Sequence, residues 1–312
     1  MKSFYIIYKN TYLLSLDYME YIKNNYQNIF GKVITFASVS YFIYFLITNI
    51  NFFNDLFKFS LLYVFIILFL NFLNILFMSN INLFILKSIN VKLNFYQSLE
   101  VSVKNSLGNI TTPFKLGVVY KISYLKKFFN LKLPDFIYAN TIFSFINLLP
   151  ALIFLITYFL LNKSISLEYK NHYLLIFLVF ILFIILFFKT KQFKFLFKKS
   201  KKVNLKSINS FYVQINNLLY FINSSFIVWL IILGIKENYL FFSAVTYNSI
   251  NTAVSIVTLT PGNIGIKEAS ISFLNNLHGL DIYLIILISF IERFLSLISL
   301  IIFDMILNKR NN

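Results

Sequence analysis

The stretch that decides the fold is Leu259–Glu268, which reads Leu-Thr-Pro-Gly-Asn-Ile-Gly-Ile-Lys-Glu. It places a proline, two glycines and two opposite charges inside a long apolar run. Proline removes a backbone donor and interrupts a helix, and glycine permits backbone angles that other residues avoid. Inside a bilayer such a break is tolerated only where protein or a water-filled cavity satisfies the freed backbone groups. The stretch is therefore expected to line a cavity.

A second break with the same pattern lies in the first half of the chain. Residues 112–117 read Thr-Pro-Phe-Lys-Leu-Gly and residues 260–265 read Thr-Pro-Gly-Asn-Ile-Gly, an offset of 148 residues in a chain of 312. Paired segments of this kind in corresponding halves point to the binding site of a transporter. The residues predicted to form the two breaks around one cavity are Thr112, Pro113, Gly117, Thr260, Pro261, Gly262 and Gly265.

The composition indicates a protein embedded in a membrane. Hydrophobic residues make up 59% of the chain and charged residues only 12%, whereas a soluble domain carries about 25% charged residues. Apolar runs that approach or exceed the ~20 residues needed to cross a bilayer recur along the whole length. We therefore expect an all-α polytopic membrane protein, with residues 1–312 forming a single integral membrane domain.

Charge and residue usage exclude several function classes. The net charge of +17 indicates lysine-rich cytoplasmic loops rather than a nucleic-acid partner. Cysteine is absent, so disulfides, thiol nucleophiles and cysteine-ligated metals are excluded. The two histidines, His172 and His278, stand far apart, so neither a metal site nor a cofactor is expected. Acids and histidines are too sparse for a hydrolytic site, and we expect no enzymatic activity.

Six apolar segments are predicted to cross the membrane as helices. They cover residues 33–50, 59–78 with an extension to 86, 136–161, 173–188, 215–235 and 282–305. The two broken elements, residues 87–134 and 239–276, are predicted to be re-entrant hairpins entering from opposite sides, as an inverted repeat requires. Residues 239–257 are also long enough to span outright, so the predicted fold has six to eight transmembrane helices. Residues 121–129 are expected to return along the membrane surface.

Lysine placement predicts the topology. Residues 189–206 carry eight lysines and no acid, which is typical of a cytoplasmic loop. Residues 1–30 form a predicted interfacial segment, residues 31–188 the first half and residues 207–312 the second half. With both termini cytoplasmic, the chain is predicted to be a multi-pass protein of the cell (inner or plasma) membrane.

The last predicted span carries two adjacent charges, Glu292 and Arg293. A charge at the bilayer centre costs about 2.5–3.5 kcal/mol on insertion scales and faces the bundle interior or a wet cavity. Neighbouring side chains point roughly 100° apart on a helix, so the two cannot both face one partner. Arg293 is predicted to bind a phosphate through its planar guanidinium group, which can donate to two oxygens at once. The alternative is a structural ion pair between Arg293 and Glu268.

Further charges flank the two breaks. Lys267 and Glu268 follow the second break, where a restarting helix would aim its first N–H groups at the cavity and attract an anion. Glu268 is equally an ordinary acid of a first helical turn. Lys115 and Lys121 occupy the corresponding region of the first half, with interfacial snorkelling as their alternative role. The candidate substrate-binding residues are therefore Arg293, Glu292, Glu268, Lys267, Lys115 and Lys121.

Three short motifs resemble those of a known family. Residues 260–268 read Thr-Pro-Gly-Asn-Ile-Gly-Ile-Lys-Glu, residues 112–117 contain Pro-x-Lys-x-Gly, and residues 292–295 read Glu-Arg-Phe-Leu. In order and spacing they resemble the motifs of the lysylphosphatidylglycerol synthase transmembrane family, also called flippase-like membrane proteins. The sequence departs from the family pattern where Asn263 replaces a glycine, Lys267 an arginine and Val118 a glutamate.

The resemblance implies movement of lipids or lipid-linked molecules between leaflets. Its implied partners are a phospholipid or polyprenyl-phosphate-linked substrate and the enzymes of envelope biosynthesis. The larger synthases add a soluble aminoacyl-transfer domain, whereas this chain is expected to end directly after its last span. We predict a flippase-like protein that translocates or binds a phosphate-bearing lipid or lipid-linked precursor. The alternatives are the membrane part of a phosphatidylglycerol lysyltransferase system and a non-transporting scaffold for glycolipid synthesis.

Overall fold

The fold is built from helices. A computed structural model describes residues 59–111, 116–161, 210–235, 240–255, 263, 265–273 and 279–311, and every regular element within these ranges is an α-helix. Several predictions lie outside the described residues. They concern residues 1–30, the spans 33–50 and 173–188, the loop 189–206, both histidines, and Thr112, Pro113, Lys115, Thr260, Pro261 and Gly262.

Four long helices are apolar enough to cross a membrane. They are α3 (Leu61–Ser88), α6 (Leu133–Leu161), α9 (Ser210–Ile235) and α13 (Ile282–Asn311). A helix of about 20 residues rises the ~30 Å of a hydrocarbon core, and each of these is longer. They confirm the apolar helices predicted over residues 59–86, 136–161, 215–235 and 282–305.

Two pairs of shorter helices flank the predicted breaks. The first pair is α4 (Phe95–Thr111) and α5 (Leu116–Phe129), and the second is α10 (Phe241–Val254) and α11 (Ile266–Phe273). In each half one helix therefore ends and another begins around the Thr-Pro segment. The 14 residues of α10 rise only about 21 Å, so this helix is too short to cross the hydrocarbon core by itself.

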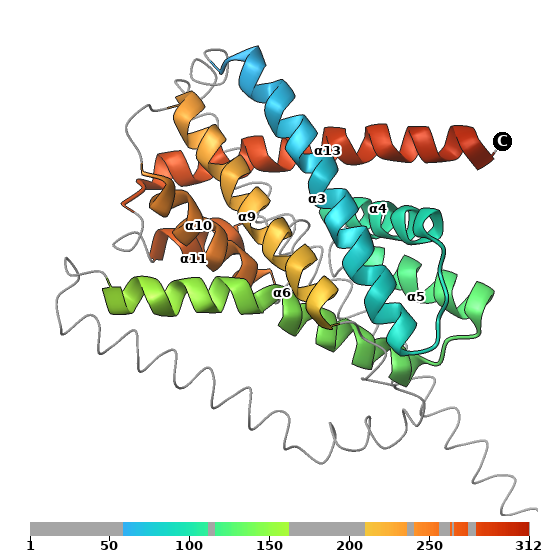
Figure 1. Cartoon of the computed structure of the whole chain (residues 1–312). Helices are drawn as coiled ribbons and strands as arrows, with labels where there is room; N and C mark the ends of the chain where they lie inside the picture. The colour runs from blue at the N-terminus through green and yellow to red at the C-terminus, as the bar shows by residue number, and fades with distance from the viewer. Residues whose placement is uncertain are drawn as a thin grey trace, which may run out of the picture.

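The described helices follow the same order in both halves: long, short, short, long. Figure 1 shows α3 and α9 side by side and running in opposite directions, and α6 likewise runs opposite to α13. The halves also interlock. The last long helix of each half packs on the first short helix of the other, α6 on α10 and α13 on α4.

A polar seam joins the two central helices, α3 and α9. The amide of Asn223 on α9 donates to the backbone carbonyl of Leu70 and to Oδ1 of Asn74 on α3, both at 2.8 Å. The amide of Asn74 donates in turn to the hydroxyl of Ser224 at 3.1 Å. Apolar side chains give helices little reason to associate in lipid, so interhelical hydrogen bonds and close packing hold such helices together.

Gly117 allows α5 to lie directly against α4. A Cβ atom at this position would sit 1.9 Å from the backbone carbonyl oxygen of Asn105, which no side chain can do. One face of α5 packs into the protein, where Lys121 and Leu125 are 5% and 0% exposed, while Phe128 on the other face is 60% exposed. Close packing at the glycine brings the face with Lys121 and Leu125 into the interior of the protein. That residues 121–129 return along the membrane surface stays a prediction.

Candidate functional site

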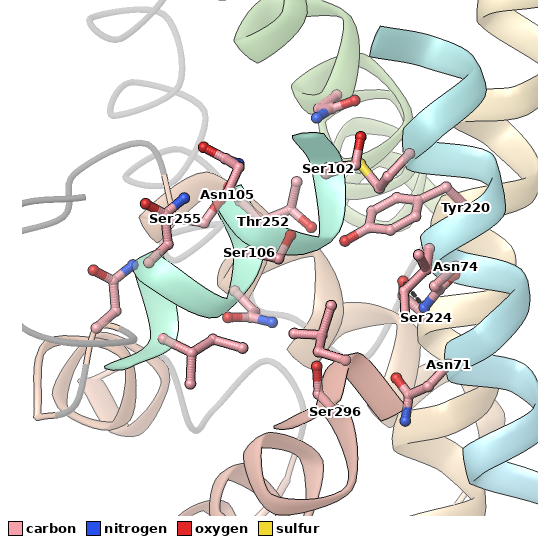
Figure 2. Close-up of a pocket in the computed structure, with 18 of the residues that line it drawn as sticks. Asn71, Asn74, Ser102, Asn105, Ser106, Tyr220, Ser224, Thr252, Ser255 and Ser296 are labelled. Atoms are coloured by element: carbon pink, nitrogen blue, oxygen red, sulfur yellow. Dashed lines mark hydrogen bonds between the residues drawn. The ribbon is translucent and has the colours of Figure 1, made fainter. Parts of the chain in front are cut away.

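The site is a partly open cavity of about 420 Å³, lined by many polar side chains from helices of both halves. Figure 2 shows side chains entering it from α3, α4, α9, α10 and α13. Residues next to both breaks line it: Asn109 and Val118 at the first, and Ser255 and Asn263 at the second. Of the predicted break residues, Gly117 and Gly265 are described and are not part of this lining. That the two breaks themselves enclose one cavity stays a prediction.

Asparagine is the residue type that characterises the lining. Ten asparagines face the cavity: Asn71, Asn74, Asn82, Asn105, Asn109, Asn140, Asn147, Asn248, Asn251 and Asn263. An amide in a membrane-embedded helix needs a hydrogen-bonding partner, since hydrocarbon offers none. Water or a polar ligand in this cavity can supply it.

The polar lining repeats between the halves. The residues that α4 contributes include Ser102, Asn105, Ser106 and Asn109, and those of α10 with its C-cap residue are Asn248, Asn251, Thr252 and Ser255. Both sets follow the spacing i, i+3, i+4, i+7 that places side chains on one helix face. Each α10 residue lies 146 positions after its α4 counterpart (248 − 102 = 146). This polar stripe was missed in the sequence, although its helical spacing was visible there.

In the first half, Lys121 reaches the cavity through a chain of polar contacts. Its amine donates to Oδ1 of Asn82 at 2.6 Å, and the Asn82 amide donates to Oγ of Ser102 at 2.9 Å. The ring of Phe143 lies 5.4 Å from the amine, within cation–π range. No carboxylate of the described residues lies within ion-pairing distance. Interfacial snorkelling of Lys121 is therefore wrong, since its amine is held inside the protein.

In the second half, two ion pairs join the start of α11 to α13. The amine of Lys267 contacts Glu292 Oε2 at 2.6 Å, and Nη1 of Arg293 contacts Glu268 Oε1 at 2.7 Å. The predicted divergence of Glu292 and Arg293 is correct, because each takes a different residue of α11. The alternative prediction for Arg293, an ion pair with Glu268, is also present.

Glu268 holds the restart of the broken helix in place. Its carboxylate accepts the backbone N–H of Gly265 at 2.7 Å and the hydroxyl of Ser289, as well as pairing with Arg293. A carboxylate at the third helical residue that accepts the N–H of the capping residue is the capping-box arrangement. Glu268 is not among the residues that line the cavity. In this structure it positions Arg293 and α11.

Arg293 keeps one edge of its guanidinium free. Nη1 is used by Glu268, while Nε and Nη2 are buried and have no hydrogen-bond partner among the described residues. These two nitrogens form the side edge of the planar group, which matches two oxygens of one phosphate or carboxylate. Arg293 lines the cavity, so the free edge suits an anion bound there.

The buried lysines of the two halves have different partners. Lys121 and Lys267 are 146 residues apart, the offset that also relates the polar residues of α4 to those of α10. Lys267 meets the carboxylate of Glu292, whereas Lys121 meets the ring of Phe143. Among the described residues, Lys121, Lys267 and Arg293 are therefore accompanied by two carboxylates, Glu268 and Glu292, and both of these are paired within the second half.

The backbone of the second break explains one departure from the family motif. Asn263 has a φ of 59° and Gly265 a φ of 84°, both in the left-handed region. Glycine enters this region freely, and asparagine tolerates it better than most residues. Asn263 can therefore replace a glycine there, and its side chain reaches the cavity.

One comparison with known proteins gave a match. The family model described as lysylphosphatidylglycerol synthase TM region matches residues 29–303. That range contains both breaks, the four long helices up to residue 303 of α13, and all of the cavity lining. No match was found among the curated proteins or among the solved structures. Among the described residues, no group of three His, Asp or Glu side chains gathers as a metal site would require.

Proposed function

Because this chain belongs to the family of the lysylphosphatidylglycerol synthase TM region, we propose that it binds a phosphate-bearing lipid headgroup and carries it between the leaflets of a membrane. The observation that carries the proposal is the free edge of Arg293 in a polar cavity that also contains Lys121. The free edge would hold two phosphate oxygens, and Lys121 would attract the anion as a point charge.

The proposed substrate is a phospholipid or a polyprenyl-phosphate-linked precursor of the cell envelope. Its polar head would occupy the cavity while its tail stays in lipid, so that the charged group never meets hydrocarbon. The protein would act in the cell membrane with both termini in the cytoplasm. Binding and movement need no covalent step, and the proposal assigns no catalytic residue.

The arrangement of the halves supports an alternating-access mechanism. The shared order of helices, the opposite directions of α3 and α9, and the interlocked packing are those expected of an inverted repeat with two re-entrant pairs. One half would rock against the other about the cavity, opening it to each leaflet in turn.

A translocation assay with purified protein in liposomes tests the proposal. Arg293→Lys retains a cation for Glu268 but loses the side edge of the guanidinium. We expect it to slow transfer of a labelled anionic phospholipid at least about tenfold, since a charge-assisted hydrogen bond contributes about 1.5–3 kcal/mol. Lys104→Arg is the control, because Lys104 pairs with Glu100 at 2.7 Å away from the cavity lining. Equal transfer by wild type and Arg293→Lys, with both folded, would overturn the assigned role.

Two further observations separate the alternatives. Aminoacylated lipid formed by cells that express the chain alone would favour a lysyltransferase system. Transfer no faster than in protein-free liposomes, together with a glycolipid synthase that co-purifies in stoichiometric amount, would favour a scaffold. Transfer that depends on Arg293 supports the flippase-like function.

A further inference from the structure

We infer that Lys121 takes up a proton when an anionic headgroup enters the cavity and releases it when the headgroup leaves, so that transport is coupled to proton movement in the same direction. This inference rests on the proposed function and adds the ion to which transport is linked. It follows from the surroundings of the Lys121 amine. They differ from those of Lys267, the other buried lysine among the described residues of the lining.

The described neighbours of the Lys121 amine are uncharged. Lys121 lines the cavity and is 5% exposed. Its amine donates to Oδ1 of Asn82 on α3 at 2.6 Å, and the rings of Phe136 and Phe143 on α6 lie 6.0 Å and 5.4 Å from it. An amide dipole and two ring faces favour a cation only weakly compared with a carboxylate. The ammonium form of Lys121 is therefore poorly compensated while the cavity is empty.

The charged side chains of the surrounding helices do not compensate Lys121. Apart from Lys121 itself, those on the described parts of α3, α4, α5 and α6 are Lys87, Glu100, Lys104, Lys126, Lys127 and Asp135. Glu100 pairs with Lys104 at 2.7 Å, and the ring of Tyr120, next to Lys121 in the chain, lies 6.0 Å from the Lys104 amine. The other three lysines are exposed. No described carboxylate, Asp135 included, lies within ion-pairing distance of Lys121.

Lys267 is buried to a similar degree but is paired. It is 4% exposed, and its amine contacts Glu292 Oε2 at 2.6 Å. Burial alone favours the neutral form of a lysine, whereas a nearby opposite charge favours the protonated form. Arg293 pairs with Glu268, and a guanidinium keeps its charge at every pH that a protein tolerates. Among the described cations of the lining, Lys121 is therefore the one that releases its proton most readily.

An anion bound beside Lys121 supplies the missing negative charge. The amine then takes a proton from a hydronium ion of the cavity water, so that an N–H bond forms, an O–H bond breaks and water remains. Because the protein binds more protons with the anion than without it, each of the two raises the affinity for the other. Departure of the headgroup into the opposite leaflet reverses the step and returns the proton to water on that side.

The direction of the pH dependence follows from this linkage. At a pH low enough to protonate the amine in the empty cavity, the cavity is electropositive and its affinity for the anion is constant. As the pH rises through the range in which only the anion-bound protein keeps the proton, the affinity falls by up to about tenfold per pH unit for one linked proton. Above this range the amine is neutral in both states, and the affinity is low and constant.

Binding of labelled phosphatidylglycerol to the full chain in nanodiscs tests the linkage. Its phosphodiester keeps one negative charge from about pH 6 to about pH 10, the range in which a buried lysine titrates below its ordinary pKa. We expect the wild-type affinity to fall at least about tenfold across this series. Lys121→Arg should bind with nearly constant affinity, because a guanidinium does not lose its proton, and Lys121→Met should bind weakly throughout.

Lys104→Arg is the matched control for this series. It makes the same change at a lysine that is not part of the lining, so it should keep the pH dependence of wild type. Wild-type binding that does not vary over the series would overturn the inference. So would a variation with pH that Lys121→Arg retains in full.

A pH gradient across proteoliposomes tests the coupling itself. The membrane potential is held at zero, and a gradient of about one pH unit is placed where wild-type binding varies. We expect labelled phosphatidylglycerol to accumulate several-fold, and at most about tenfold, in the leaflet that faces the more alkaline side. Lys121→Arg should distribute the label equally between the leaflets.

The outcomes distinguish the inference from the proposed function. Rapid transfer by wild type that ends in an equal distribution would overturn the inference alone. Absence of transfer by wild type at every pH would count against the function itself. Should Lys121→Arg fail to fold, the wild-type binding series and the wild-type response to the gradient still decide the inference.

Discussion

At the scale of single residues, one asparagine has two roles in the site. It adopts a left-handed backbone conformation and it contributes a polar side chain to the cavity lining. Asn263 adopts a φ of 59° and lines the cavity, and its amide oxygen is buried with no hydrogen-bond partner among the described residues. A positive φ favours glycine or asparagine, and of these two residues only asparagine has a side chain that can accept a hydrogen bond. Substitutions at this position can therefore separate folding from binding.

Asn263→Val should destabilise the protein, because a β-branched residue in the left-handed region costs about 1–3 kcal/mol. Asn263→Gly should keep the melting temperature close to that of wild type and still weaken binding of a labelled anionic phospholipid, since it removes a polar side chain from the cavity lining. Thermal unfolding in detergent measures the first effect and lipid binding in nanodiscs the second. A Val variant as stable as wild type would show that this backbone conformation is not needed.

At the scale of elements, the close contact between α4 and α5 determines how deeply Lys121 is buried in the protein. Gly117→Ala places a methyl group where the Asn105 carbonyl oxygen already sits, at 1.9 Å, so α5 must move. We expect a loss of about 1–3 kcal/mol in unfolding free energy, as for other overpacked sites, and weaker anion binding.

Gly234→Ala is a matched control for this contact. The atoms nearest to its added methyl group belong to the ring of Phe59, the first at 2.3 Å, and a side chain can turn aside where a backbone carbonyl cannot. Its effect on stability should be smaller, with anion binding unchanged. Similar losses in the two variants would contradict the account of Gly117.

The long helices were predictable from the sequence, whereas the cavity was only partly so. Runs of apolar residues fix the existence of α3, α6, α9 and α13, because ~20 such residues have few alternatives to a membrane helix. The Thr-Pro segments predicted where the short helices are interrupted. The intramembrane charge of Arg293 led to the prediction of an ion pair with Glu268. The amide lining was missed because asparagine is abundant throughout this chain. The burial of Lys121 was missed because it depends on packing at Gly117, which no local pattern shows.

At the scale of the whole molecule, the two halves share one architecture but not one charge distribution. The second half pairs both of its site cations, whereas the first half leaves Lys121 beside Phe143. This asymmetry gives the cavity between two similar halves an excess of positive charge. We therefore propose that the space between the halves is hydrated and electropositive.

The absence of cysteine from the chain allows a direct measurement of this claim. Ser106→Cys and Thr252→Cys place one thiol each at corresponding positions of the lining. Ser98→Cys is the control, since Ser98 lies on α4 but is buried away from the cavity. Each variant is reacted in liposomes with an anionic or a cationic water-soluble methanethiosulfonate.

The account predicts that both cavity thiols react, that each reacts several-fold faster with the anionic reagent, and that phosphatidylglycerol slows the reaction. Thiolates in a hydrated, positively charged environment form and react readily, and the added charge favours an anionic reagent over a cationic one. The control thiol should react with neither reagent. Cavity thiols that are inert to both reagents, or that react faster with the cationic one, would contradict the account.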